Sequence, residues 1–138
     1  MKEKQVIDKQ KLNEKIAKWL KFEYICHTIS EPWVFKPNDG NNGIEIHGNR
    51  WITPDGNAAL IMLPLFTDSM DACEKWIVPE LIKRGIRIDM IYYTVGGCST
   101  CLRDFKNNIA FPDTSEYKIS LAFCLALEQY IDWRNSKS

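Results

Sequence analysis

The strongest constraint on the fold is an apolar stripe near the end of the chain. Hydrophobic side chains recur there at the three- and four-residue spacing of one helical face. They are Ile119, Ala122, Phe123, Ala126, Leu127 and Tyr130. The pattern Asp113-x-x-Glu116 precedes them and is typical of a helix start, because both side chains can cap free N–H groups. We therefore expect a helix over residues 113–133 whose apolar face is covered by other elements.

Two further helices are predicted. Residues 9–21 carry a second apolar stripe at helical spacing. A third helix starts at Asp68 or Thr67, either of which can cap it. We expect a break near Val78, because Pro79 has no N–H to donate, and an end at Gly85.

The segments between the helices have the features of strands. Short β-branched and aromatic runs separated by turn residues predict a meander of two or three antiparallel strands over residues 44–63 and a strand over residues 86–95. The order of helix, strands, helix, strands and helix favours the α+β class, with helices packed on a mainly antiparallel sheet. The 138 residues suit a single domain, 1–138, with residues 1–8 expected to form a flexible tail.

Charge and composition exclude several classes of protein. The 18 basic and 18 acidic side chains cancel, which argues against a nucleic-acid-binding protein, since such proteins need a surplus of Lys and Arg. The sequence has no apolar run of the length that a membrane span requires, and its charged N-terminus is not a secretory signal. Five cysteines, an odd number, indicate reduced thiols in a cytoplasm.

The stretch GGCSTC, residues 96–101, places two cysteines at C-x-x-C spacing. A zinc site needs two further ligands, and the sequence offers no second paired motif. A redox pair needs a following helix, where this sequence has features of a strand and turn. On one strand, Cys98 and Cys101 would point to opposite faces of the sheet. We therefore expect no metal and no cofactor, and interpret Gly96–Gly97 as the bend of a β-hairpin.

The sequence has no Walker A loop, no H-E-x-x-H motif and no G-x-S-x-G motif. Cys26 and His27 are adjacent, so on a strand their side chains point apart and cannot share a proton. The carboxylates are scattered singly, and no pair has a spacing suited to shared acid–base work. These observations favour a protein that is not an enzyme. An enzymatic function stays an open alternative.

Candidate ligand-binding residues lie mainly in the turn-rich region between the first two helices. Aromatic faces can stack on bases, and Arg and Lys pair with phosphate, so the mixture suits an anionic, base-containing small molecule. The candidates are Trp33, Lys36, His47, Arg50 and Trp51, with Arg103 from a later strand. The alternative is that Trp33 and Trp51 pack in the core while the charged side chains are solvated.

Three stretches resemble a known family: KIAKWLKFE, WITPDG followed by LPLFTDSMDACEKW, and FPDTSEYKISLAFCLALEQYIDW. Together they resemble the phage ABA sandwich domain family of small bacteriophage and prophage proteins. The resemblance implies a three-layer α/β/α sandwich with three principal helices and a location in the cytoplasm of the bacterial host. It transfers no catalytic residue. The chain differs from the family at Leu65, where an acidic residue is common, and in a longer segment over residues 36–50.

Three functions remain open. The first is a non-enzymatic phage accessory protein that sequesters a small, anionic, nucleotide-like signal of host defence and forms a homodimer or higher homo-oligomer. The second is an interaction module that inhibits a host or phage protein, for which an exposed apolar patch would be typical. The third is a small phosphodiester hydrolase that uses His27 or His47 as acid or base.

Overall fold

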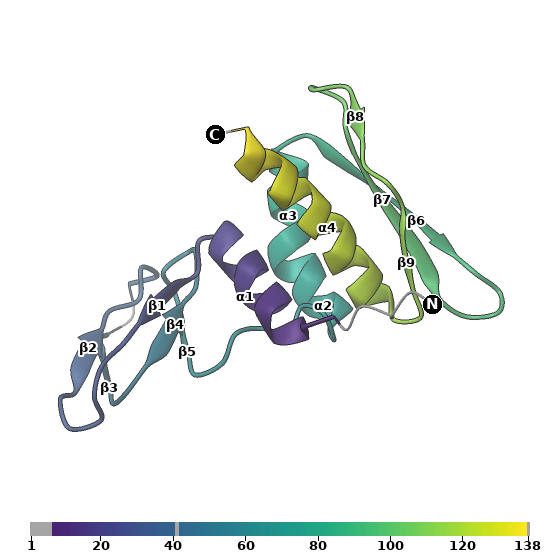
Figure 1. The fold of residues 1–138 in the computed structure, drawn as a ribbon. Helices are drawn as coiled ribbons and strands as arrows, with labels where there is room; N and C mark the ends of the chain where they lie inside the picture. The colour runs from purple at the N-terminus through teal and green to yellow at the C-terminus, as the bar shows by residue number, and fades with distance from the viewer. Residues whose placement is uncertain (1–6, 41, 138) are drawn as a thin grey trace. The chain divides into compact units, whose positions relative to one another are not determined.

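The structure is a computed structural model that describes residues 7–40 and 42–137 (Figure 1). The chain divides into two compact units, unit 1 (Met1–Ile16 and Pro64–Ser138) and unit 2 (Ala17–Leu63). The single domain expected for 1–138 stays a prediction. Of the tail expected at residues 1–8, positions 1–6 lie outside the described residues.

Three helical segments lie where the sequence predicts helices. The first, α1 (Lys9–Trp19), starts in unit 1, and the last, α4 (Ile119–Ser136), buries the predicted stripe from Ala122 to Tyr130. Between them in sequence the chain forms α2 (Met70–Ala72), a π-helical turn η1 (Cys73–Ile77) and α3 (Val78–Lys83). Pro79 lies in the first turn of α3, directly after the π-helical turn, and has no N–H to donate to the preceding turn of this continuous helical segment. The break expected near Val78 is therefore a change in helical winding.

The predicted starts of α2 and α4 are both wrong in detail. Ser69, and not Thr67 or Asp68, caps α2, and its hydroxyl accepts the N–H of Ala72 at 3.2 Å. The Asp113-x-x-Glu116 pattern does not begin a helix. Thr114–Glu116 forms strand β9 and pairs with β7 (Cys98–Asp104), and α4 starts three residues after Glu116. The ladder to β7 satisfies more backbone groups than a local cap would.

Unit 1 contains an antiparallel sheet in which β7 is central. It pairs on one side with β6 (Ile86–Tyr92) and on the other with β8 (Ile109–Ala110) and β9. Residues 93–97 connect β6 to β7, with Gly96 and Gly97 at φ of 101° and 99°, a region that glycine adopts readily. The predicted hairpin entry at GGCSTC is confirmed.

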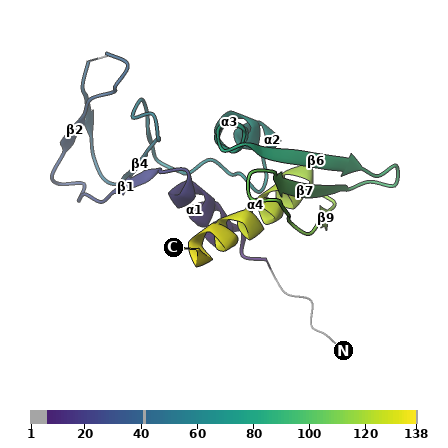
Figure 2. The same cartoon turned by 90° about the horizontal axis from the view of Figure 1, so that it is seen from above.

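The helices of unit 1 lie on one face of this sheet (Figures 1 and 2). Cys98, Thr100 and Leu102 are fully buried on the helix-covered face of β7. On the other face Arg103 is exposed, whereas Ser99 and Cys101 are also buried. Cys98 and Cys101 therefore point to opposite faces, as their spacing predicts. The mixed α+β class with antiparallel sheets is confirmed, and the three-layer arrangement is not.

Unit 2 consists of short strands and turns. One sheet has the order β1 (Glu23–Ile25), β4 (Arg50–Ile52) and β5 (Ala59–Leu60), and a separate hairpin joins β2 (Trp33–Phe35) to β3 (Ile44–Ile46). The predicted meander is thus confirmed for β4 and β5 only, because β3 pairs with β2 instead of β4. Among the described residues of the whole chain, no helix has the length and apolar character needed to cross a membrane.

Candidate functional site

Three of the predicted ligand-binding residues gather at one turn of unit 2. The turn His47-Gly48-Asn49 joins β3 to β4, and Trp33 at the start of β2 donates its indole N–H to the carbonyl oxygen of Gly48 at 3.0 Å. Nη1 of Arg50 donates to the carbonyl oxygens of His47 and Asn49 at 3.2 and 2.8 Å. These contacts hold the Trp33 indole and the Arg50 guanidinium group at the turn that contains His47, which we call the 47–49 turn.

His27 joins this group, which the sequence did not predict as a ligand residue. Its imidazole stacks on the ring of Trp33, with centroids 5.5 Å apart and planes inclined by 22°. Its backbone N–H donates to Oδ1 of Asn49 at 2.8 Å, which fixes the segment after β1 against the turn. Nδ1 of His47 lies 3.4 Å from the carbonyl oxygen of Ile29 in the same segment. In the sequence, only the turn residues 47–49 indicate that these side chains lie close together. Nothing in the sequence indicates that His27 stacks on Trp33.

The basic side chains of this group have no acidic partner among the residues that the structure describes. None of the ion pairs there involves Arg50, His27 or His47. Nη2 and Nε of Arg50 also make no hydrogen bond within residues 7–40 and 42–137. The guanidinium group therefore keeps donors for a ligand, while Nη1 holds it to the turn.

The other predicted ligand residues lie elsewhere. Lys36 follows the far end of β2, three residues from Trp33, which is on the order of 10 Å along a strand. Trp51 neighbours Arg50 on β4, so its side chain points to the opposite face of the sheet, where it contacts Tyr24 with ring centroids 4.7 Å apart. Arg103 belongs to unit 1 and pairs with Asp89 at 2.9 Å. The six-residue site stays a prediction, and the structure brings three of its members together.

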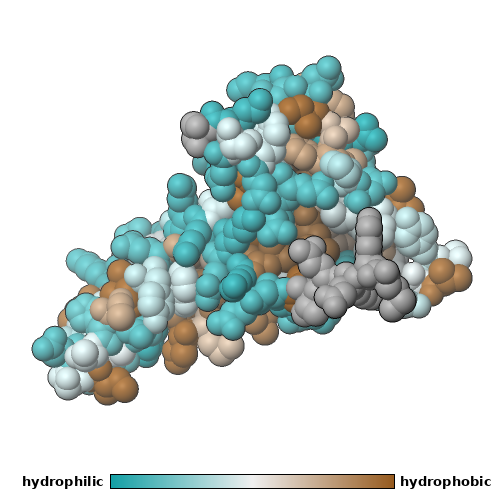
Figure 3. Space-filling view, viewed as in Figure 1, coloured by the Kyte–Doolittle hydropathy of each residue, from teal (hydrophilic) through white to brown (hydrophobic). Residues whose placement is uncertain are grey.

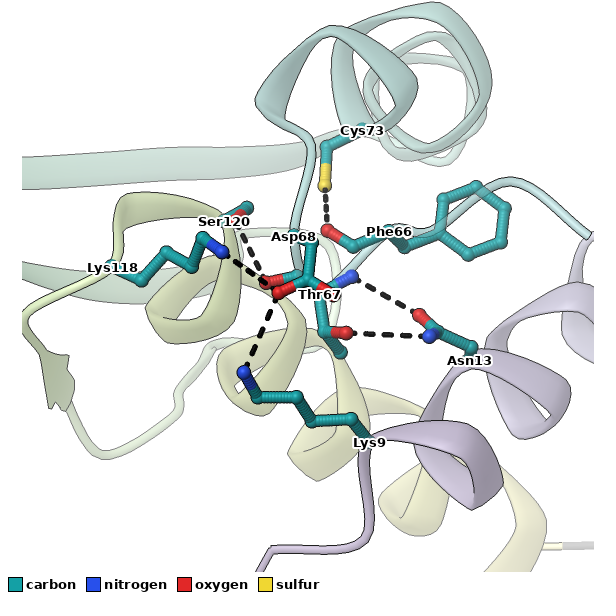
Figure 4. Close-up of polar contacts among 8 residues, drawn as sticks. All are labelled: Lys9, Asn13, Phe66, Thr67, Asp68, Cys73, Lys118 and Ser120. Carbon is teal, nitrogen blue, oxygen red and sulfur yellow. Dashed lines mark hydrogen bonds and ion pairs between the residues drawn. The ribbon is translucent and has the colours of Figure 1, made fainter.

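A second polar cluster, in unit 1, surrounds Thr67 just before α2 (Figure 4). The backbone N–H of Thr67 donates to Oδ1 of Asn13 at 3.0 Å, and its hydroxyl oxygen accepts from Nδ2 of the same side chain at 3.3 Å. Its carbonyl oxygen accepts from the Ser120 hydroxyl at 2.8 Å. Every polar group of this fully buried residue therefore has a protein partner, which indicates a link between α1 and α4 and leaves no group for a substrate.

Asp68 completes this cluster at the surface. Lys118 and Lys9 approach its Oδ1 from two sides, at 2.8 and 3.4 Å (Figure 4). The hydrogen bond from Lys118 holds the pKa of the Asp68 carboxyl below its ordinary value, with a smaller contribution from Lys9. A carboxylate kept ionised by two lysines is a poor general acid or base near neutral pH.

The cysteines do not form a reactive centre. Cys98 and Cys101 are buried, and burial together with the Asp113 carboxyl raises the pKa of the Cys101 thiol. Sγ of Cys73 lies 3.9 Å from Sγ of Cys124, and this contact and burial raise the pKa of the Cys124 thiol. Within the described ranges, no three His, Cys, Asp or Glu side chains are grouped as metal ligands.

Two cavities of unit 1 lie at the ends of its hairpins. One of about 270 Å³ is bounded by Tyr93, Gly96 and Tyr117 beside the β6–β7 turn. The other, of about 130 Å³, includes Arg103 and Phe105. Ligand pockets for drug-sized molecules usually measure about 300–1,000 Å³, so the cavity at Arg103 is too small to enclose a nucleotide.

Comparison with known protein families, with curated proteins and with solved structures finds no match for this chain. The resemblance to the phage ABA sandwich domain family stays a prediction.

Proposed function

We propose that the protein is a non-enzymatic binding protein that captures a small anionic, nucleotide-like molecule at the 47–49 turn. The observation that carries the proposal is the guanidinium group of Arg50, which keeps free donors and has no carboxylate partner among the described residues. The Arg fork matches phosphate geometry with two parallel hydrogen bonds.

The aromatic residues of the turn suit the base of such a ligand. Trp33 and His27 form a stacked pair next to the turn, and a base can extend a stack of this kind. Basic and acidic side chains nearly balance in unit 2, so recognition would depend on short-range contacts and not on a long-range positive field.

Binding without turnover is favoured over hydrolysis. In the described residues, the imidazole contacts of His27 and His47 are an indole ring and a backbone carbonyl, and neither contact orients a nucleophile or an acid–base partner. The predictions of a three-layer sandwich, a phage origin, a location in the host cytoplasm and a role as an anti-defence sponge belong to this proposal through the family resemblance.

The test is calorimetric titration of the purified protein with AMP, a cyclic dinucleotide, inorganic phosphate and uncharged adenosine. We expect one of the nucleotides to bind more tightly than phosphate or adenosine alone. Arg50→Lys should weaken that binding about tenfold or more, because Lys keeps the charge and loses the fork. Lys18→Ala, which removes an exposed cation of the same unit, is the matched control and should change little.

Two further variants define the extent of the site. Trp33→Ala should weaken nucleotide binding more than phosphate binding, since stacking acts on the base. Lys36→Ala measures whether the ammonium group of Lys36 contributes to binding. Absence of binding to every ligand of the series, or binding unchanged in Arg50→Lys, would refute the proposal.

One observation favours a second function, that of a protein-binding module. Val95, in the β6–β7 turn, is 84% exposed, and the exposed Tyr93 and Tyr117 bound the cavity next to this turn. Figure 3 shows hydrophobic surface at this end of unit 1. Exposed apolar groups of this kind are typical of interaction surfaces. A stoichiometric host protein retained by the wild type and lost in Val95→Ser, with nucleotide binding absent, would favour this second function.

A further inference from the structure

Strand β6 has a free edge. Within the described residues, β6 pairs only with β7. The carbonyl oxygen of Leu102 accepts from the N–H of Phe111 at 2.9 Å, on the side of β7 away from β6, so its partner Ile88 is a non-hydrogen-bonded position of the β6–β7 ladder. The same alternation makes the N–H and C=O groups of Ile86, Ile88 and Met90 point away from β7. An edge with such unpaired groups is a template for another strand.

The charges of β6 select one way of pairing this edge with a second copy of the same strand. If Ile88 lies opposite Ile88 of the second copy in antiparallel pairing, Arg87 of each copy lies opposite Asp89 of the other. A shift by two residues in one direction places Asp89 opposite Asp89, and in the other direction Arg87 opposite Arg87. Among these three registers, only the first pairs opposite charges.

The charges on β6 and β7 are also incompletely matched within one copy. Arg87 lies directly opposite Arg103 in the ladder, and both guanidinium groups share the carboxylate of Asp89, at 2.8 and 2.9 Å. Like charges in directly opposed positions are destabilising. In the register centred on Ile88, Asp89 of the second copy supplies a carboxylate beside Arg87, and by symmetry the same holds for both copies.

Exposed apolar residues flank both ends of the free edge. Ile82 stands near the end of α3, just before β6, and Ile91 and Tyr92 stand at the end of β6; all three are more than half exposed. Antiparallel pairing brings the start of one strand next to the end of the other, so these groups from the two copies lie near each other. Among the described residues other than its chain neighbours, none has an atom within 4 Å of the position of a Cβ at Gly85, which leaves room for Ile91 of the second copy opposite it.

We infer that a second copy of this chain pairs with β6 edge to edge, antiparallel, with the two-fold axis at Ile88. The two sheets of unit 1 then form one continuous sheet across the dimer. The inference rests on residues of unit 1 alone and stands independently of the proposed ligand site in unit 2.

The first test is the oligomeric state of the full-length protein by sedimentation velocity over a range of concentrations. We expect a monomer–dimer equilibrium. Arg87→Glu and Asp89→Arg should each raise the dimer dissociation constant about tenfold or more, because each places like charges opposite one another twice. The double variant Arg87→Glu/Asp89→Arg should restore dimerisation, since it exchanges the two charges. Lys106→Glu, an exposed cation outside β6, is the matched control.

The second test is amide hydrogen exchange, which locates the interface. The N–H groups of Ile86, Ile88 and Met90 should be protected at high protein concentration and exchange faster on dilution. Thermal unfolding of each variant checks that it is folded. A monomer at every concentration, a dimer whose dissociation constant does not change in the single variants, or a double variant as weak as the single ones would overturn the inference.

Discussion

The side chain of Asn13 forms two hydrogen bonds with Thr67, one to its backbone N–H and one to its hydroxyl. Asn13 lies in α1 and Thr67 lies 54 residues later, before α2, so the contact links two distant parts of unit 1. Both residues are buried. A buried amide that satisfies two groups of one residue is a specific and sensitive point of the fold.

Asn13→Ala should lower the free energy of unfolding by about 1–3 kcal/mol, because it leaves the buried N–H of Thr67 without an acceptor. Ser120→Ala should also destabilise the protein, through the carbonyl oxygen of Thr67. Urea unfolding followed by circular dichroism measures both effects. Lys11→Ala, an exposed change in the same helix, is the control. Equal stability of Asn13→Ala and Lys11→Ala would contradict this account of the cluster.

The Asp68 ion pairs predict a pH dependence of stability. Because the pKa of Asp68 is lower in the folded than in the unfolded chain, its stabilising contribution is complete above the ordinary carboxyl pKa and is lost as pH falls through the folded pKa. Asp68→Asn should therefore be less stable than the wild type at neutral pH, and the difference should shrink in acid. The pairs are exposed, so high salt should reduce the difference as well.

The control for this prediction is Asp71→Asn, which removes an exposed carboxylate from α2 with no ion pair among the described residues. High salt should change its stability difference less than that of Asp68→Asn, because it removes no lysine ion pair. Unfolding free energies from pH 2 to pH 7 provide the measurement, and a difference between wild type and Asp68→Asn that is constant over this range would show that the lysine contacts do not matter.

The cysteines provide a test of the buried faces of unit 1. Cys26 is exposed, and the other four cysteines, Cys73, Cys98, Cys101 and Cys124, are buried. Thiols react as thiolates, and the raised pKa values of Cys101 and Cys124 reduce the thiolate fraction further. Mass spectrometry after brief alkylation should show one modified cysteine in the folded protein and five in urea. Fast modification of Cys98 or Cys101 in the folded state would be inconsistent with the β7 packing.

The sequence predicts those elements whose hydrophobic pattern is local. The stripe of α4 and the period-two alternation of Cys98 and Cys101 are both visible in the sequence, and both agree with the structure. The starts of α2 and α4 were not predictable, because tertiary partners take the local capping groups. Asn13 and Ser120 form hydrogen bonds with Thr67, and β7 pairs with the strand that contains Glu116.

The candidate site is predictable only in part, for a related reason. Residue types and turn signals identified Trp33, His47 and Arg50, which lie close together in sequence or across one hairpin. Stacking of His27 on Trp33 and the pairing of Arg103 with Asp89 depend on how strands meet, which single residues do not encode. Arg50 and Trp51 are adjacent on β4, so their side chains point to opposite faces of the sheet and cannot share one site.

Alanine substitution should lower the free energy of unfolding by different amounts at Gly97, in the GGCSTC stretch, and at Gly85. Gly97 has a φ of 99°, and an added Cβ would lie 3.2 Å from the carbonyl oxygen of Glu116. Gly85, at the end of α3, has a φ of 76° and open space around its Cβ position. Gly85→Ala should therefore introduce backbone strain alone, about 1 kcal/mol, whereas Gly97→Ala adds a contact with a backbone atom that cannot move freely. We expect Gly97→Ala to lower the unfolding free energy more than Gly85→Ala does. Chemical denaturation compares the two, and equal losses would mean that β9 moves away from β7 at no cost.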